Sequence, residues 1–192
     1  MSFYLTAPRM KHAYVQHHNV LSNFDIQEIF KYISTQNLEQ GLLANGKAND
    51  TIRRSKVLFL PVVTETKWLY NKIGQFLVES NQKHFGVDLT ALQSIQYTEY
   101  HAENSGTYDD HLDFAPLTPL PRKLSVSIQL SDDTDYEGGD LQLKMSSQKP
   151  YCASRLKGDG LVFPSWILHG VTPVTKGVRK SLVVWAEGPE WR

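Results

Sequence analysis

From Leu92 onward the chain is made of short segments in which apolar and polar side chains alternate. The clearest case is Leu124–Leu130, where branched aliphatic residues occupy one set of positions and Ser125, Ser127 and Gln129 occupy the other. Successive side chains of an extended strand point to opposite faces. This segment therefore predicts a strand with one apolar and one polar face, and a chain rich in such segments favours antiparallel sheets.

Similar short segments, separated by glycine, proline and acidic turn formers, fill the rest of this half of the chain. The predicted strands are Leu92–Tyr100, Tyr108–Asp113, Leu124–Leu130, Asp140–Lys144, Cys152–Leu156, Gly160–Phe163, Gly170–Val174 and Lys180–Ala186. About eight short strands with this punctuation predict a mainly β fold, a sandwich or a jelly roll.

The first part of the chain has helical periodicity instead. Ser22 is a candidate N-cap for a helix over Asn23–Thr35, and Thr64 for a second helix that runs to His84 and stops at Gly86. We expect both helices to cover one face of a sheet. The segment between them, Gln36–Asp50, is predicted to be a loop.

These patterns predict a single domain over residues 1–192, with a helical support region at 1–91 and a β core at 92–187. Lys and Arg together number 20, as do Asp and Glu, so the formal net charge is zero and no global charge favours a nucleic acid or membrane partner. The single cysteine, Cys152, excludes an internal disulfide and is expected to be a small buried or half-buried side chain. Without an evident signal peptide, a cytoplasmic protein is expected.

Candidate metal ligands lie in two distant places. His111 and Asp113 are two residues apart, so in a regular strand they share a face, and His169 follows much later. Two imidazoles and one carboxylate on three positions of an octahedron form the facial triad of non-haem Fe(II) oxygenases. Arg179 adds a fixed cation suited to a carboxylate.

Several other motifs appear in a fixed order around these ligands. They are Tyr100, Tyr108, Gly138-Gly139-Asp140-Leu141, Gly158-Asp159-Gly160 before His169, and Arg179-Lys180-Ser181-Leu182. With the triad, this string resembles the Fe(II)- and 2-oxoglutarate-dependent dioxygenases, and among them the prolyl 4-hydroxylase-like group with its compact bacterial and viral forms. The resemblance covers about Leu92 to Glu187.

The resemblance implies a double-stranded β-helix, the cupin-like jelly roll, with the N-terminal helices packed on one sheet. It implies Fe(2+), 2-oxoglutarate and O2 as cofactor and cosubstrates, with ascorbate as a reductant, and a prolyl residue of a peptide or protein as the substrate. The triad would hold iron, and Arg179, Tyr100, Gln129 and Ser181 would hold 2-oxoglutarate.

Alternation along the last strand places Ser181 and Trp185 on the side of Arg179, so Trp185 is a candidate wall of the pocket. Tyr108 has an odd spacing from His111, so in a regular strand it faces away from the metal, and we expect it to pack or to line the entrance. Arg53 and Arg54 are expected to be a solvated pair, with contact to the substrate as the second interpretation. Substrate choice is expected to reside in Gly41–Arg54 and Asp132–Glu137.

Other functions remain open from the residues alone. A sister dioxygenase could act on a free amino acid or another small metabolite with the same triad. A metal-free jelly roll could serve as a binding module. Two histidines and a carboxylate also hold catalytic zinc, with Asp109 or Asp110 as the base, but a zinc hydrolase leaves Arg179 and Tyr100 without a role.

Overall fold

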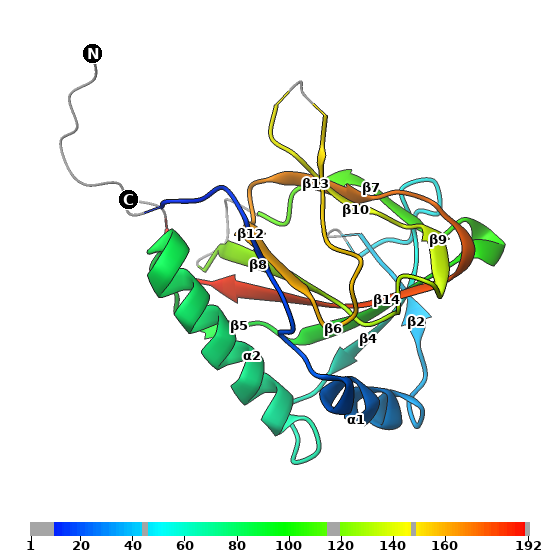
Figure 1. Cartoon of the computed structure of the whole chain (residues 1–192), viewed down its shortest axis with the longest axis horizontal. Helices are drawn as coiled ribbons and strands as arrows, with labels where there is room; N and C mark the ends of the chain where they lie inside the picture. Colours follow the sequence, from blue (N-terminus) through cyan, green and yellow to red (C-terminus); the bar gives the residue numbers. More distant parts are fainter. Residues whose placement is uncertain (1–9, 44–45, 115–119, 147–148, 191–192) are drawn as a thin grey trace.

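Two antiparallel sheets face each other, and two helices pack on the larger one (Figure 1). The computed structural model describes residues 10–43, 46–114, 120–146 and 149–190. In these residues the larger sheet has the strand order β1 (Val15–His17), β12 (Gly160–Pro164), β8 (Arg122–Gln129), β14 (Val174–Glu187), β6 (Ile95–His101), β4 (Lys56–Leu60) and β2 (Glu39–Gln40), with β5 (Ala91–Leu92) and β9 (Tyr136–Gly138) also paired to β14. The smaller sheet has the order β11 (Tyr151–Cys152), β10 (Leu141–Lys144), β13 (Leu168–Val171), β7 (Thr107–His111) and β3 (Arg53–Arg54). The predicted jelly-roll class is confirmed.

The first helix, α1 (Asn23–Ile33), begins as predicted at Ser22. The Ser22 hydroxyl accepts a 3.2 Å hydrogen bond from the backbone N–H of Asp25, and the Asp25 carboxylate accepts a 2.7 Å bond from the N–H of Ser22. This capping box satisfies two backbone donors that the helix itself leaves free. The Asp25 carboxylate also pairs with Lys72 on the second helix at 2.6 Å, which ties the two helices together.

The second helix, α2 (Lys67–Ser80), starts two residues later than predicted, because Thr66 and not Thr64 occupies the N-cap position. The Thr66 hydroxyl donates to the Pro61 carbonyl and makes no side-chain cap. A π-helical turn over Asn81–Phe85 (η1) continues the helix to Gly86, whose φ of 63° ends it as predicted.

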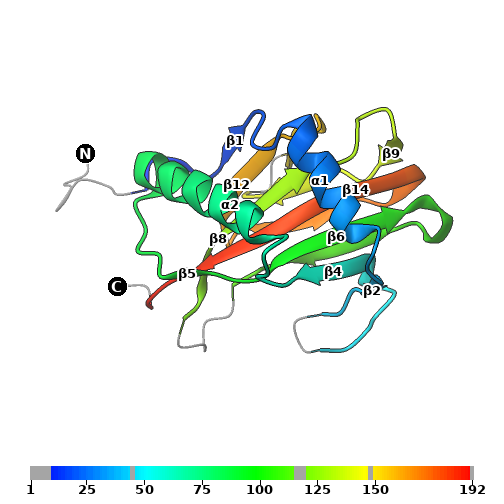
Figure 2. The same ribbon diagram turned by 90° about the horizontal axis from the view of Figure 1, so that it is seen from below.

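Both helices lie across one face of the larger sheet, as the view from below shows (Figure 2). Their buried residues, among them Ile29 and Ile73, pack in one cluster with Leu124, Val126 and Ile128 of β8. The polar positions of β8 therefore face the opposite way, toward the smaller sheet. The alternation seen in the sequence thus separates a helix-covered apolar layer from an inner polar surface.

The segment before residue 92 also supplies strands. β4 pairs with β6 and β2 in the larger sheet, and β3 pairs with β7 in the smaller one. The predicted loop over Gln36–Asp50 therefore contains a short strand. A tight approach follows it, because a Cβ on Gly41 would lie 2.3 Å from the Ser55 hydroxyl.

Cys152 is exposed on the edge strand β11, so the expected burial is wrong. His17 lies with its ring against Phe76 and makes a 2.9 Å hydrogen bond to Ser80. No helix in the described residues has the length and apolar character needed to cross a bilayer.

Candidate metal centre

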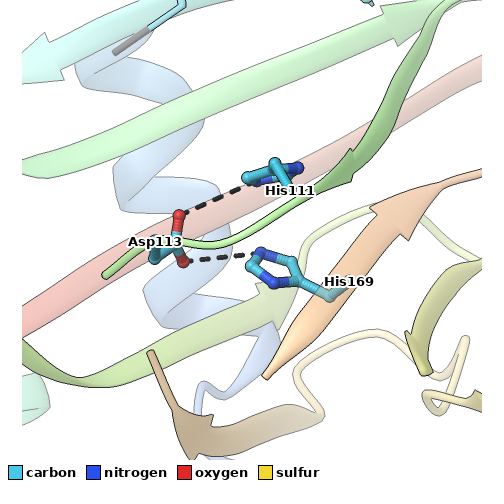
Figure 3. A group of neighbouring side chains, drawn as sticks. All are labelled: His111, Asp113 and His169. Carbon is cyan, nitrogen blue, oxygen red and sulfur yellow. Dashed lines mark ion pairs between the residues drawn. The ribbon is translucent and has the colours of Figure 1, made fainter. Parts of the chain in front are cut away.

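His111, Asp113 and His169 converge on one point between the two sheets (Figure 3). His111 ends β7 and lies directly opposite His169 of β13 in the ladder, and Asp113 follows two residues past the end of β7. Nε2 of His111 is 3.7 Å from Oδ1 of Asp113, and Nε2 of His169 is 3.4 Å from Oδ2. The three ligand atoms all lie within 4.8 Å of one another, which is close enough for one ion to reach all three.

Hydrogen bonds select the nitrogen that each histidine offers. Nδ1 of His111 lies 2.8 Å from the carbonyl of Asp109, and Nδ1 of His169 lies 2.9 Å from the carbonyl of Ile167. A carbonyl can only accept, so the proton is assigned to Nδ1 in both rings and the lone pair to Nε2. Both Nε2 atoms face Asp113, which is the arrangement that metal-binding histidines adopt.

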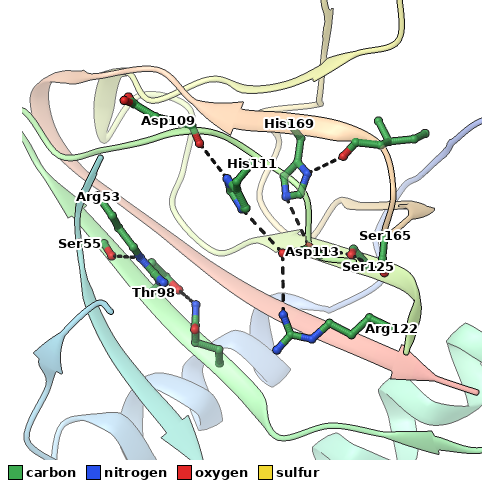
Figure 4. Close-up of polar contacts among 12 residues, drawn as sticks. Arg53, Ser55, Thr98, Asp109, His111, Asp113, Arg122, Ser125, Ser165 and His169 are labelled. Atoms are coloured by element: carbon green, nitrogen blue, oxygen red, sulfur yellow. Dashed lines mark hydrogen bonds and ion pairs between the residues drawn. The ribbon is translucent and has the colours of Figure 1, made fainter. Parts of the chain in front are cut away.

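Asp113 is held by the opposite sheet (Figure 4). The hydroxyl of Ser125, an inward residue of β8, donates a 2.7 Å hydrogen bond to Oδ2 and lies 2.9 Å from the hydroxyl of Ser165. The backbone N–H of Asp113 donates to the carbonyl of Ser165 at 3.0 Å. Both the backbone and the carboxylate of Asp113 are therefore fixed without a metal.

The protonation states suit a cation. Burial lowers the pKa of His111 to about 4, with His169 adding to the shift and Asp113 opposing it, so the ring is neutral at pH 7. Burial alone would raise the pKa of Asp113, but the two histidines and the Ser125 hydroxyl outweigh it and lower that pKa below its ordinary value. Two neutral imidazoles and one carboxylate form a donor set that fits Fe(II).

A cavity of about 820 Å³ opens beside the triad. Its lining includes Arg179, Tyr100, Ser181, Tyr108 and Trp185, together with the three candidate ligands. Gln129 does not line this cavity. It lies in a much smaller one of about 10 Å³, which it shares with Arg179, and its amide donates a 3.1 Å bond to the Tyr136 hydroxyl.

Arg179 is buried in the inner layer of the larger sheet, directly opposite Tyr100 in the β14–β6 ladder. Its Cζ lies 5.6 Å from the centroid of the Tyr100 ring, and its Nη1 is 3.4 Å from the hydroxyl of Ser181. Burial raises the pKa of Tyr100 and keeps the hydroxyl protonated. Lys180, the next residue, faces the helices, with its ammonium 5.1 Å from the centroid of the Phe30 ring.

The Gly138-Gly139 pair makes room for this arginine. Both residues have positive φ, and a Cβ on Gly139 would lie 3.1 Å from Cδ of Arg179. A Cβ on Gly138 would lie 2.1 Å from the carbonyl oxygen of Pro173. The pair therefore gives both the turn that only glycine adopts easily and the space for the Arg179 stem.

Tyr108 does not face away from the metal centre, so that expectation is wrong. Its ring stacks on His111 with centroids 3.6 Å apart and planes at 17°. The reason is a β-bulge: His169 pairs with His111 and Val171 with Tyr108, so two residues of β7 lie opposite one residue of β13. The extra residue puts Tyr108 and His111 on the same face. Tyr108 lines the cavity, in agreement with the expectation that it packs or lines the entrance.

The sequence reasoning missed Arg122 at the cavity and favoured a solvated position for Arg53. Arg53 is buried and lies with its Cζ 4.6 Å from the centroid of the Tyr108 ring, so the expected solvated pair is wrong for this residue. Arg122 lies with its Cζ 3.9 Å from the centroid of the Trp185 ring, and its Nη1 is 4.0 Å from Oδ1 of Asp113. Only tertiary pairing brings these side chains to the cavity, and no spacing in the sequence marks them.

The other candidate groups lie elsewhere. Asp109 and Asp110 do not line the cavity, and Asp110 pairs with Lys144 at 2.5 Å, so neither is placed as the base of a hydrolase. Of the two segments expected to govern substrate choice, Gly41–Arg54 reaches the cavity through Leu42 and Arg53. Asp132–Glu137 contributes no lining residue.

Comparison with known sequences gives a consistent result. The sequence profile described as "2OG-Fe(II) oxygenase superfamily" matches residues 95–187. A PKHD-type hydroxylase of Synechococcus sp. (strain CC9311) is 41% identical over 85 residues, which are 44% of this chain and 38% of that protein. A PKHD-type hydroxylase of Idiomarina loihiensis is 28% identical over 158 residues, or 78% and 68% of the two chains. The match to the first curated relatives thus spans less than half of their length.

Solved structures show the same fold. A Trichoplax adhaerens prolyl hydroxylase, in complex with a peptide fragment of the hypoxia inducible factor oxygen degradation domain, superposes with a TM-score of 0.76 at 19% identity. That match covers 91% of this chain and 83% of the other. A Pseudomonas putida prolyl-4-hydroxylase superposes with a TM-score of 0.75 at 17% identity, covering 91% and 92%.

Proposed function

We propose, from the match of residues 95–187 to the 2OG-Fe(II) oxygenase superfamily, that the protein is an Fe(II)- and 2-oxoglutarate-dependent dioxygenase that hydroxylates an unactivated C–H bond. One observation carries the proposal: the His111–Asp113–His169 triad and the buried Arg179 open onto the same cavity of about 820 Å³. A metal-free binding module would have no need for three ligands with their lone pairs directed at one point.

Each inner residue has a distinct task in this proposal. His111 and His169 would bind iron through Nε2, and Asp113 would bind it through the carboxylate that Ser125 orients. Arg179 would bind the distal carboxylate of 2-oxoglutarate, with the protonated Tyr100 hydroxyl and Ser181 as further hydrogen-bond donors. When bound, iron would activate O2, which is the oxidant, and 2-oxoglutarate, as it is oxidised to succinate and carbon dioxide, would supply two of the four electrons that O2 accepts. The protein supplies orientation and a site shielded from bulk water.

We place Gln129 behind Arg179 in this scheme. It shares the small second cavity with Arg179 and does not line the main one. It would therefore support the arginine and would not contact 2-oxoglutarate directly.

For the substrate we propose a prolyl residue of a peptide or protein. The Trichoplax neighbour was solved with a peptide, and the Pseudomonas neighbour is a prolyl-4-hydroxylase. In this chain, Leu42, Phe59 and Leu112 line the cavity and are also 46%, 53% and 49% exposed. Apolar residues at an open rim suit a polypeptide that extends beyond the site, whereas a metabolite enzyme should close over its substrate. Trp185 and Arg122 would form the substrate wall.

A spectroscopic titration tests the reaction class. Fe(II) and 2-oxoglutarate added anaerobically to the protein should give a metal-to-ligand charge-transfer band, and His111→Ala should abolish it. A zinc hydrolase or a metal-free module would give no band.

Mass spectrometry then tests the substrate. Proline-rich peptides incubated with enzyme, iron, 2-oxoglutarate and ascorbate should gain one oxygen. Oxygen gained by free amino acids, with no change in peptides, would favour the small-metabolite alternative.

A further inference from the structure

Arg53 is a buried cation whose role the proposed reaction leaves unexplained. Its side chain is 6% exposed, and its guanidinium donates to the Ser55 hydroxyl through Nε and to the Leu42 carbonyl through Nη1, both at 2.8 Å. The backbone is fitted to it, because a Cβ on Gly41 would lie 2.6 Å from Nε of Arg53. The segment after β2 is therefore wrapped around this guanidinium.

On its other side the guanidinium begins a stack that ends at a candidate metal ligand. Arg53 lies opposite Tyr108 in the β3–β7 ladder, with Cζ 4.6 Å from the centroid of the tyrosine ring. The Tyr108 ring lies 3.6 Å from the His111 ring at 17°. Figure 4 shows Arg53 and His111 on the same side of the site. Guanidinium, phenol and imidazole thus form three consecutive layers.

His111 has a specific need for such support. The hydrogen bond from Nδ1 to the Asp109 carbonyl selects Nε2 for the metal, but one hydrogen bond does not fix the plane of the ring. His169 is 6% exposed, and the centroid of its ring lies 4.8 Å from the centroid of the Phe163 ring in a T-shaped contact. The His111 side chain, in contrast, is 19% exposed at the cavity. A ring stacked on one face of His111 restricts its rotation.

The neighbouring arginine shows that this arrangement is particular to Arg53. Arg54 points to the other side of β3, and its guanidinium donates to the carbonyls of Ser105 and Asp50 at 2.7 to 3.1 Å. It does not line the cavity. The two residues share a charge, a strand and a size, so Arg54 is a matched control.

We propose that Arg53 is a positioning residue for the metal centre: it holds Tyr108 against His111 and so fixes the plane of that ligand. This inference rests on the proposed function for the metal site. A planar guanidinium can stack on a ring while donating hydrogen bonds at its edge, and a lysine ammonium cannot. Because the same group binds the Leu42 carbonyl at the rim, Arg53 also connects the substrate-facing loop to the metal ligand.

The test uses Co(II) with the full-length, metal-free protein and needs no 2-oxoglutarate. The dissociation constant and the visible absorption of the bound Co(II) are measured for wild type, R53Q, R53K and R54Q. We expect R53Q and R53K to raise the dissociation constant for Co(II) about 10-fold or more and to change the absorption bands. A rise of this size is usual when a residue that supports a metal ligand is lost. R54Q should remain within about 2-fold of wild type.

A second pair of variants separates stacking from folding. Y108F keeps the ring and should bind Co(II) like wild type, whereas Y108L removes the ring and should bind like R53Q. This pair decides the matter if circular dichroism shows that R53Q is unfolded. Equal binding by Y108L and Y108F would overturn the proposal, as would wild-type binding by R53Q or equal weakening by R53Q and R54Q.

H111A distinguishes the two levels of inference. Loss of Co(II) binding in H111A with normal binding in R53Q rejects only the role of Arg53. If the wild-type protein binds no Co(II), or if H111A binds Co(II) as tightly as wild type, both the metal centre and the positioning role of Arg53 are rejected.

Discussion

Ser125 donates a 2.7 Å hydrogen bond to Asp113 across the gap between the two sheets. Ser125 belongs to β8 of the larger sheet, and Asp113 follows β7 of the smaller sheet. The orientation of the carboxylate therefore depends on the spacing of the two sheets, so a change in the packing of the sheets would change the geometry of the metal centre.

Removal of this bond should weaken metal binding without loss of a ligand. We expect S125A to raise the dissociation constant for Co(II) about 10-fold, because the carboxylate loses the donor that orients it. Titration of the metal-free protein measures the effect. Ser127→Ala, at the next inward position of β8, is the control; Ser127 lines the cavity. Equal behaviour of the two variants would show that the hydrogen bond is irrelevant to the site.

Arg179 should control affinity for 2-oxoglutarate and leave metal affinity unchanged. R179Q removes a charge-assisted pair worth about 1.5–3 kcal/mol, so the dissociation constant for 2-oxoglutarate should rise about 10- to 100-fold. R179K, which keeps the charge and loses the fork, should show a smaller rise. Calorimetric titration of the metal-loaded protein measures both. K180Q, on the opposite face of β14, is the control and should bind 2-oxoglutarate like wild type. Wild-type affinity in R179Q would contradict the role of Arg179.

Acid should destabilise the metal-free protein between pH 6.5 and 4. Burial holds the pKa of His111 at about 4, below the 6.5 of an unfolded chain. In that window the unfolded state binds a proton that the folded state does not, so the free energy of unfolding falls as pH falls, by on the order of 2–3 kcal/mol. Burial lowers the pKa of His17 and His84 in the same direction.

Urea denaturation at several pH values measures this dependence. H111Q, which cannot titrate, should show a flatter profile than wild type, with the remaining slope due to the other histidines. The lowered pKa of Asp113 costs stability mainly below about pH 4, where the unfolded carboxyl takes up most of its proton, so it contributes little in this range. An identical slope in H111Q and wild type would contradict the prediction.

Gly138 and Gly46, two glycines at positive φ, should differ in their tolerance of a side chain. Gly138 has φ 71° and Gly46 has φ 74°, so both substitutions by alanine incur a similar backbone strain of about 1 kcal/mol. Only at Gly138 would the new Cβ meet a carbonyl oxygen, at 2.1 Å, whereas no described atom lies within 4 Å at Gly46. G138A should therefore lower the free energy of unfolding by at least about 1–2 kcal/mol more than G46A. Equal losses in urea denaturation would show that the backbone relieves the contact.

The inner face of the larger sheet could be predicted from the sequence because β8 and β14 are regular. Alternation along β14 put Arg179, Ser181 and Trp185 on one side, and all three line the cavity. Strand geometry alone does not say which residues far apart in the sequence meet. His111 and His169 could be paired in advance because two imidazoles and one carboxylate form a recognised set of metal ligands.

Most of the misses have one physical cause, which is that local patterns carry no information on pairing between strands. The bulge in β7 reverses the phase between Tyr108 and His111, and it is defined by the register with β13. Arg53 becomes buried only because β3 pairs with β7. Cys152 is exposed because β11 is an edge strand of the smaller sheet. The cap at Thr66 could not be distinguished from one at Thr64 by residue type alone.

The strands that precede residue 92 have a consequence for protein engineering. β1, β4 and β3 pair with β12, β6 and β7, so each sheet of the shared segment 95–187 is completed by chain from outside it. If that segment were excised and expressed alone, these three ladders and the β5–β14 ladder would lose a partner, and the apolar surface under α1 and α2 would face water. The segment that the family profile matches is thus expected to aggregate in isolation, and transplants between homologues should carry the N-terminal elements with them.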